Sequence, residues 1–263
     1  MKIMTDMIIN FVNPSFFCLV IFLIFFSEIY LRWKPCIFRL IIILRFNEMK
    51  NKIDIKKITF RNETPEDYRA VENLTREAFW NVYMPGCYEH FILHNFRNRD
   101  NFVQELDIIM EENGILVGHV MFVRAEIKLN NGGILPIMTF GPISIAPDFK
   151  RKGYGTILLR HAMEQAKKMG CGALAITGNI DFYGKSGFVA GKTRGICYEA
   201  DPDAVYFLIK ELIPGFLDKV KEAGGGIFKE PDGYFICDKK DVEAFDSQFP
   251  PKEKLRLPGQ IFE

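Results

Sequence analysis

The chain has 263 residues, of which 48% are hydrophobic and 25% are charged, and its formal net charge is +1. This length allows one generous domain or two small ones with an ample core, and the near-neutral balance excludes the basic excess that is typical of nucleic-acid binding. The six cysteines are far apart, with no CxxC pair. They therefore predict reduced thiols in a cytosolic protein, rather than a disulfide framework or a zinc knuckle.

The first 48 residues are mostly apolar. No charge occurs from Met7 to Ser27, and this stretch is long enough to span a bilayer. A cleaved signal peptide is disfavoured, because no small-x-small cleavage site follows. A single-pass anchor would leave the rest of the chain in the cytoplasm, because basic residues follow the span. The third interpretation is that Met49 is the true start of a cytoplasmic protein, and we favour it over the anchored alternative.

Past Met49 the sequence alternates between strand and helix patterns. Lys57 to Asn62 is predicted to form a strand, and Thr64 is predicted to cap a helix with Pro65 at its first position. Apolar residues spaced by three and four place one face of that helix against the core. A second helix is predicted over "EHFILHNF".

Most of the predicted strands follow these helices. Leu106 to Met110 and Ile115 to Leu129 are predicted to pair across the turn "EENG", and a further strand, "ILPIMTFGPISIA", leads to Pro147. A helix is expected over 154–169, then a strand at "ALAITG", a short helix at "DFYGKSGF" and a strand at "GICYEA". The pattern predicts a mixed α/β domain over 56–200, with a C-terminal extension over 201–263.

The stretch "FKRKGYGTIL" places three cations and two glycines before a helix. It is no Rossmann fingerprint, because Leu158 stands where the third glycine belongs, and "GKS" further on has the wrong spacing for a P-loop. Gly153 and Gly155 allow close approach of a ligand to the backbone, and amides at a helix start attract anions. The loop therefore predicts an anion site that suits pyrophosphate. The alternative is a glycine turn with solvated charges.

Several stretches together resemble the GNAT superfamily of GCN5-related N-acetyltransferases. "ISIAPDFKRKGYGTILLRHAM" is similar to its acetyl-CoA motif, with Lys150 where Gln or Arg is usual, and "NIDFYGKSGF" contains its Tyr-x-x-x-Gly-Phe pattern. "TFGPISIAPDF" and "EAFWNVYMPGCYEH" resemble a bacterial branch of predicted acetyltransferases without an assigned substrate. The resemblance covers roughly Ile58 to Tyr198. It implies a mostly antiparallel mixed sheet flanked by helices, and acetyl-CoA as cosubstrate.

The resemblance also implies a set of site residues. Backbone groups before the loop would hold the pantetheine arm, and amides of the loop would bind pyrophosphate. Tyr183 would protonate the leaving thiolate, although a tyrosine there could instead pack the turn. The implied acetyl-CoA contacts are Ile143, Ser144, Ile145, Lys150, Arg151, Lys152, Gly153, Tyr154, Gly155, Thr156 and Asn179.

The general base is not identified by the sequence. Glu89, His90 and Glu126 are candidates, and a relayed water would also serve. His90 and His94 are four residues apart on a predicted helix, but no third ligand has suitable spacing, so no metal site is predicted. The expected function is transfer of an acetyl group from acetyl-CoA to an amine of a small molecule or a protein. The alternative is a non-catalytic acyl-CoA sensor. No nucleic acid is expected as a partner, and a membrane only if residues 1–48 are genuine.

Overall fold

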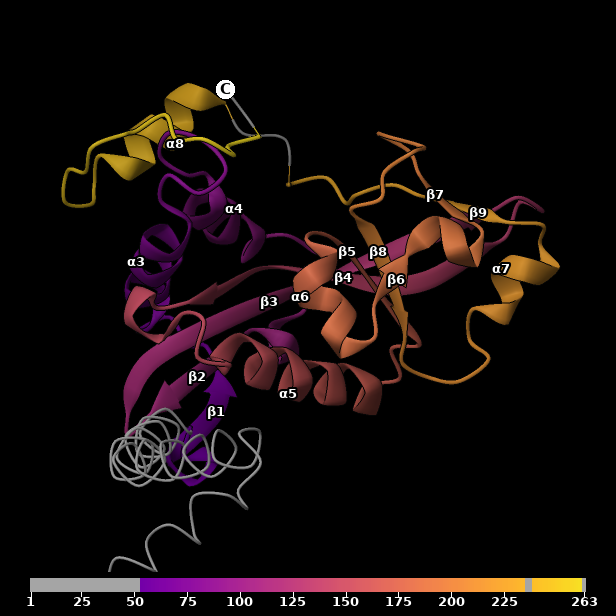
Figure 1. Cartoon of the computed structure of the whole chain (residues 1–263), viewed down its shortest axis with the longest axis horizontal. Helices are drawn as coiled ribbons and strands as arrows, with labels where there is room; N and C mark the ends of the chain where they lie inside the picture. Colours follow the sequence, from indigo (N-terminus) through magenta and orange to yellow (C-terminus); the bar gives the residue numbers. More distant parts are fainter. Residues whose placement is uncertain (1–52, 235–237, 262–263) are drawn as a thin grey trace, which may run out of the picture. The chain divides into compact units, whose positions relative to one another are not determined.

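In the computed structural model, which describes residues 53–234 and 238–261, nine strands form one sheet (Figure 1). The order is β1-β2-β3-β4-β5-β8-β6, and β9 pairs with both β3 and β7. Only the pairs β4–β5 and β7–β9 are parallel, which confirms the expected mixed, mostly antiparallel sheet. The strands are β1 (Ile58–Asn62), β2 (Ile108–Glu112), β3 (Ile115–Leu129), β4 (Ile134–Ile145), β5 (Ala173–Thr177), β6 (Val189–Ala190), β7 (Ile196–Tyr198), β8 (Phe207–Glu211) and β9 (Gly226–Phe228).

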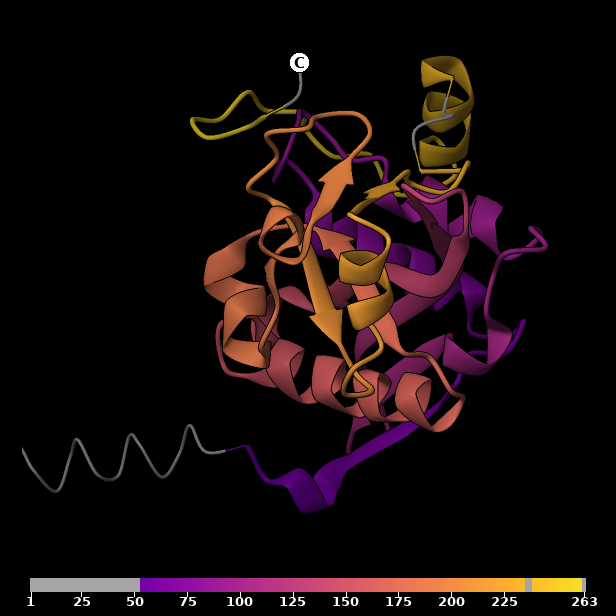
Figure 2. The same ribbon diagram turned by 90° about the vertical axis from the view of Figure 1, so that its right-hand side faces the viewer.

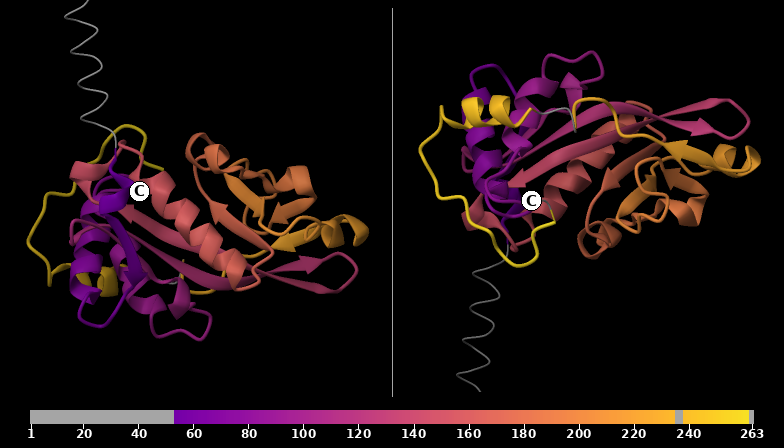
Figure 3. Two further views of the ribbon diagram at one scale, coloured as in Figure 1. Left: turned by 90° about the horizontal axis from the view of Figure 1, so that it is seen from below. Right: turned by 90° about the horizontal axis from the view of Figure 1, so that it is seen from above.

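Helices cover both faces of this sheet, as Figure 3 shows from below and from above. Helix α5 lies on one face, where its buried Leu158, Leu159 and Ala162 belong to the same core as Phe122 and Phe140. Helices α3 and α4 lie on the opposite face, with α8 beside them. The α-helices are α3 (Tyr68–Phe79), α4 (Glu89–Phe96), α5 (Tyr154–Lys168), α6 (Ile180–Tyr183), α7 (Asp218–Glu222) and α8 (Lys239–Asp246).

The start of α3 differs from the prediction. The helix begins at Tyr68 and its N-cap is Asp67, so Thr64 is not the cap. Instead the N–H and hydroxyl groups of Thr64 donate to the Asp67 carboxylate at 3.0 and 2.8 Å. Because this bonding closes a turn over residues 64–67, Pro65 precedes the helix rather than opening it.

The β2–β3 hairpin is tighter than expected. Strand β2 begins at Ile108, because Gln104–Leu106 form a 3-10 turn, and both glutamates of "EENG" belong to the strand. Only Asn113 and Gly114 make the connection, with φ of +52° and +77°. Asn-Gly with positive φ at both positions is typical of a two-residue hairpin loop.

The sheet continues past residue 200, which is where the extension was expected to begin. Strand β8 pairs antiparallel with all of β5, and β9 pairs with the outer end of β3. Figure 2 looks onto this end of the sheet, with α7 beside it. The expected boundary between 56–200 and 201–263 therefore does not coincide with a break in the sheet.

The apolar segment 1–48 lies outside the described residues. Within residues 53–234 and 238–261, no helix has the length and apolar character needed to cross a membrane.

Candidate active site

Strands β4 and β5 separate in the middle of the sheet. They pair only where Met138 and Thr139 face Leu174 and Ala175, and the Thr139 hydroxyl donates to the carbonyl oxygen of Ala175 at 3.0 Å. Beyond this point β4 continues to Ile145 with β3 along one edge and no strand of the described residues along the other. The predicted contacts Ile143 to Ile145 therefore lie on an open strand edge.

Ser144 can serve a ligand there only through its backbone. Its side chain is fully buried, and its hydroxyl donates to Thr75 Oγ1 at 3.0 Å. This hydrogen bond ties β4 to α3 on the far face of the sheet.

The predicted anion loop leads into α5 with free amides. Arg151 and Gly153 have φ of +60° and +102°, and Gly153 is the N-cap of the helix. The N–H groups of Thr156 and Ile157 donate to the carbonyl oxygen of Gly153 at 3.1 and 3.2 Å, whereas those of 151–155 have no acceptor in the described part of the chain. Unpaired amides at the positive end of a helix dipole form an anion site.

Two of the predicted loop contacts direct their side chains elsewhere. The Lys150 ammonium donates to the carbonyl oxygen of Ala78 at the end of α3, and burial together with the charge of Lys252 lowers its pKa. The Tyr154 hydroxyl donates to Glu112 Oε1 at 2.7 Å, and burial raises the pKa of this phenol to about 12. These two side chains fasten the loop to α3 and β2.

The remaining side chains of the loop are placed as an anion site requires. Arg151 and Lys152 are exposed, and Thr156 is half-buried in the first turn of α5. A Cβ atom on Gly155 would lie 3.3 Å from the Phe182 ring and 3.7 Å from Ile145 Cγ1. The helix start is therefore enclosed by α6 on one side and by the open edge of β4 on the other.

Tyr183 lies at the end of α6 with its ring in the core. The ring centroid is 5.8, 4.8 and 5.6 Å from those of Phe140, Phe182 and Phe188, and 9% of the residue is exposed. Its hydroxyl has no hydrogen-bond partner among the described residues, and burial, followed by the charge of Tyr83, raises its pKa well above 10. Tyr183 is therefore a protonated group with a free O–H.

Two neighbours fix the position of Tyr183. A Cβ atom on Gly178 would lie 2.4 Å from Tyr183 Cε2, so only glycine leaves room for the ring. Asn179, a predicted acetyl-CoA contact, caps α6 by accepting the N–H of Asp181 at 2.8 Å. Residues 178 and 179 thus join the end of β5 to the helix that carries the tyrosine.

Glu89 lies in the first turn of α4 and acts electrostatically on Tyr83. Burial raises the pKa of its carboxyl group to about 7, and it accepts the N–H of Tyr88 at 3.0 Å. The burial of Tyr83 and the charge of Glu89 raise the pKa of Tyr83, and the charge of Tyr83 in turn acts on Tyr183. The three side chains therefore share one electrostatic environment.

His90, one of the suggested bases, lies in the core between α4 and α8. It is fully buried, with Nε2 3.2 Å from Asp246 Oδ1 and Nδ1 3.4 Å from Cys87 Sγ. The arrangement Cys87–His90–Asp246 resembles a nucleophilic triad. Burial, however, lowers the pKa of His90 to about 4 and raises the pKa of Cys87 above its ordinary value. Both shifts favour the neutral thiol and the neutral imidazole, and we interpret the group as one that packs α8 against α4.

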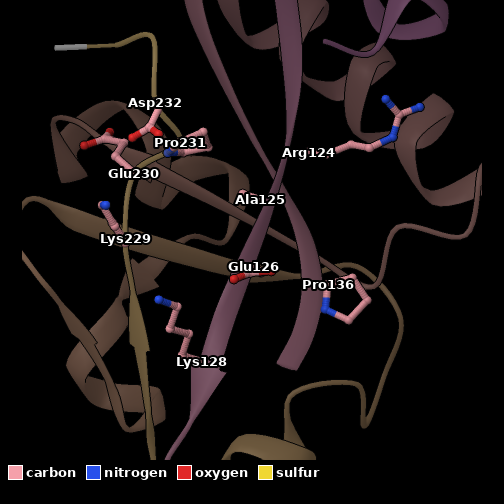
Figure 4. A pocket seen from close by; sticks show the side chains of 9 residues that line it. All are labelled: Arg124, Ala125, Glu126, Lys128, Pro136, Lys229, Glu230, Pro231 and Asp232. Atoms are coloured by element: carbon pink, nitrogen blue, oxygen red, sulfur yellow. The ribbon is translucent and has the colours of Figure 1, made fainter. Parts of the chain in front are cut away.

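Glu126, the third suggested base, lines a cavity of about 490 Å³ between β3 and residues 229–232 (Figure 4).

We call residues 229–234, which follow β9, the crossing segment. Within it, Glu230 accepts the hydroxyls of Thr177, at 3.1 Å, and Tyr198, and the Tyr234 hydroxyl donates to the carbonyl oxygen of Gly141 at 3.0 Å. These contacts could not be predicted from the sequence, because their partners are far apart in the chain.

One buried cluster of the described residues has a spacing that could hold a metal ion: Glu63, Asp107 and His119. His119 Nε2 lies 2.6 Å from Asp107 Oδ1, and Arg97 donates to both carboxylate oxygens of Glu63, at 2.9 and 2.6 Å. The guanidinium already supplies the positive charge that an ion would bring. We therefore interpret the cluster as a buried ionic network under α3 and α4.

Comparison with known proteins identifies the domain that contains this geometry. Residues 68–188 match the family model described as the acetyltransferase (GNAT) family. These residues are a domain of the GNAT family. The uncharacterized N-acetyltransferase YjhQ of Escherichia coli (strain K12) is 30% identical over 84 residues, which are 32% of this chain and 45% of that protein. The chain thus spans less than half the length of this curated relative.

Two solved structures share the fold of this GNAT domain. The GNAT family N-acetyltransferase YhbS of Escherichia coli, in complex with CoA, has a TM-score of 0.58 and 17% identity, covering 68% of this chain and 92% of its own. A GNAT family acetyltransferase from Brucella melitensis, in complex with acetyl-CoA, has a TM-score of 0.53 and 21% identity, covering 67% and 97%. The expected fold is confirmed.

Proposed function

We propose that the protein transfers an acetyl group from acetyl-CoA to an amine. The observation that carries this proposal is the meeting of three features: the open edge of β4, the free amides at the start of α5, and the unpaired hydroxyl of Tyr183. The two solved structures of the same fold contain CoA or acetyl-CoA, which supports this cosubstrate.

The proposed cosubstrate would bind mainly to the backbone. The edge of Ile143–Ile145 would pair with the amides of the pantetheine arm, as a strand pairs with its neighbour. The free N–H groups of 151–155 would bind pyrophosphate, with the Thr156 side chain beside them, and Arg151 and Lys152 would add positive charge around it. Asn179 would contact the arm from the end of β5. Lys150 and Tyr154 would support the loop from behind, because their side chains are bonded to α3 and β2.

The proposed reaction is direct attack of the amine on the thioester carbon. A C–N bond forms, the C–S bond breaks, and the amine loses one proton while the sulfur gains one. Tyr183 would supply the proton to the thiolate, since its burial keeps the phenol protonated.

Glu89 is the base that we favour for the amine. Its pKa of about 7 suits proton transfer at neutral pH, and it makes no salt bridge to a Lys, Arg or His of the described residues. Glu126 is the weaker candidate, because it is exposed on β3 beside the crossing segment, without the burial that tunes Glu89.

We also infer a cytoplasmic location. Cys87, Cys171 and Cys197 are free thiols, which suits a reducing compartment.

A screen of amines tests this function. The full-length protein is incubated with acetyl-CoA and single primary amines or lysine peptides, and thiol release is measured. We expect acetyl-CoA to raise the melting temperature and at least one amine to accelerate thiol release. A thermal shift without turnover for any amine would favour the non-catalytic acyl-CoA sensor, and no shift would refute both.

A further inference from the structure

The loop between α3 and α4 is closed on itself by one residue. We call Trp80–Tyr88 the acceptor loop, because it carries Tyr83 and leads into Glu89. Asn81 has φ of +58°, donates its N–H to the carbonyl oxygen of Gly86 at 2.8 Å, and accepts the Gly86 N–H on Oδ1 at 2.8 Å. These two bonds hold the ends of residues 81–86 together.

Asn81 also binds the C-terminal tail, residues 250–261. Its Nδ2 donates to the carbonyl oxygen of Glu253 at 3.0 Å, and its Oδ1 accepts the N–H of Leu255 at 3.1 Å. Its own carbonyl oxygen accepts Nε2 of Gln260 at 3.1 Å. The backbone and side chain of one asparagine therefore join the acceptor loop to a segment more than 170 positions away.

Further bonds join the same tail to the start of the loop, to Tyr83 and to the end of α3. Trp80 Nε1 donates to the carbonyl oxygen of Glu253 at 2.9 Å, and the Ile261 N–H donates to the carbonyl oxygen of Tyr83 at 3.0 Å. Lys252 Nζ lies 2.7 Å from Glu77 Oε2, at the end of α3. The tail has no regular secondary structure, so these contacts give it its course.

We propose that Asn81 is a positioning residue, through which the C-terminal tail holds the acceptor loop in place. Tyr83 is 41% exposed and has only a tilted contact with Phe79, at 6.0 Å, among the ring pairs of the described residues. Its position therefore depends on the backbone of the loop, which Asn81 and the tail define. The kinetic consequence rests on the proposed function: a loosened loop should weaken binding of the amine while leaving the acetyl-CoA loop intact.

The first test needs no acceptor amine. Asn81→Ala is made in the full-length chain, and hydrogen–deuterium exchange is followed for the amides of 81–88. We expect exchange to be faster by about tenfold or more, the scale for losing one or two net hydrogen bonds. Trp80 fluorescence should shift as its N–H loses the tail. The other tryptophan, Trp33, is the same in all variants.

Three further variants separate the side chain from the backbone conformation. Asn81→Gly allows positive φ but loses the side-chain bonds, so it should loosen the loop as Asn81→Ala does. Gln260→Ala removes the bond from the Gln260 side chain to the carbonyl oxygen of Asn81. Gln260 belongs to no hydrophobic core of the described residues, and we expect this variant to loosen the loop less. Asn113→Ala is the matched control: it also replaces an asparagine of positive φ, in the β2–β3 hairpin, and should leave the loop unchanged.

The second test is kinetic and uses the fastest amine from the screen. We expect Asn81→Gly to raise the KM for that amine by about tenfold, with kcat within about threefold of wild type. The thermal shift produced by acetyl-CoA should not change. Asn81→Asp keeps the acceptor oxygens and should be intermediate.

Unchanged loop exchange in both Asn81→Gly and Gln260→Ala would overturn the proposal, and Gln260→Ala decides if the Asn81 variants do not fold. Equal loss of acetyl-CoA binding and amine binding would also overturn it, because the loop would then support the whole fold. If no amine reacts with the wild type, the proposed function fails while the exchange experiment still decides the role of Asn81.

Discussion

The acetyl-CoA side of the proposed site and its acceptor side are built in different ways. The first consists of backbone groups from two segments close in sequence, the end of β4 and the start of α5. The second combines side chains from the acceptor loop, α4, the crossing segment and the C-terminal tail. A site made of backbone depends on local conformation, whereas one made of distant side chains depends on tertiary contacts. The two sides should therefore respond to different mutations.

The largest expected effect separates chemistry from binding. Tyr183→Phe keeps the ring in its aromatic pocket and removes the hydroxyl. We expect kcat to fall by about 10²- to 10⁴-fold, the usual contribution of general acid catalysis, with an unchanged thermal shift from acetyl-CoA. Steady-state thiol release with the screened amine measures this. A loss below about threefold, when chemistry limits the rate, would assign the proton to another group.

The next effect concerns the acetyl-CoA side alone. Gly155→Glu places a side chain 3.3 Å from the Phe182 ring and adds a negative charge at the start of α5. We expect the thermal shift to disappear; at 100-fold excess over Kd this shift corresponds to about 2.7 kcal/mol. Differential scanning fluorimetry compares the variant with Gly132→Glu, in an open turn between β3 and β4 where a Cβ atom meets nothing within 4 Å. A preserved shift would refute the placement of pyrophosphate.

The acceptor side should show its own pH dependence. The pKa of Glu89 is raised from its ordinary value of 4.5 to about 7, so kcat/KM for the amine should rise through about pH 7, and Glu89→Gln should remove this inflection. The folded protein binds this proton more tightly than the unfolded chain. Protonated Glu89 therefore contributes fully to the stability of the fold below about pH 4.5, and this contribution is lost as the pH rises through about 7. Urea unfolding of the wild type and Glu89→Gln at pH 5 and pH 8 measures the second effect.

The smallest effect concerns Lys150. Its ammonium is bonded to α3 rather than free to meet a phosphate. Lys150→Gln, which introduces a residue usual in the resembled family, should change the Kd for acetyl-CoA by less than about threefold, because the ammonium is directed at Ala78 and away from the proposed pyrophosphate site. A change above tenfold, measured by titration calorimetry, would mean that Lys150 turns toward the cosubstrate.

The sequence signals for the proposed acetyl-CoA side are local. Glycines, cations and the periodicity of α5 lie within one short stretch, and the structure places them at a helix start beside an open strand edge. The Tyr-x-x-x-Gly-Phe pattern likewise brought Tyr183 next to Phe188. Strands β1 to β5 and β7 were predicted for the same reason, apart from their ends, whereas β6, β8 and β9 were not predicted.

The contacts around the proposed acceptor side were not predicted, because they join residues that are far apart in the chain. Burial distinguishes Glu89 from His90, because it raises the pKa of Glu89 and lowers the pKa of His90. Nothing in the sequence shows that Asp246 meets His90 or that Glu253 meets Asn81. The sequence likewise does not show that the Lys150 side chain bonds to Ala78, which lies 72 positions away in the chain.

The pairing of β8 with β5 has a consequence for synthesis on the ribosome. Strand β5 is complete when residue 177 has emerged, but the neighbour that covers its edge comes only with residues 207–211. Until then the nascent chain exposes an apolar strand edge in the middle of its sheet, which is a hazard for misassembly. The outer end of β3 lacks its partner even longer, until β9 has been synthesised. Closure of this sheet is thus delayed until residues 207–228 have been synthesised, and a chaperone would have the most to protect before that point.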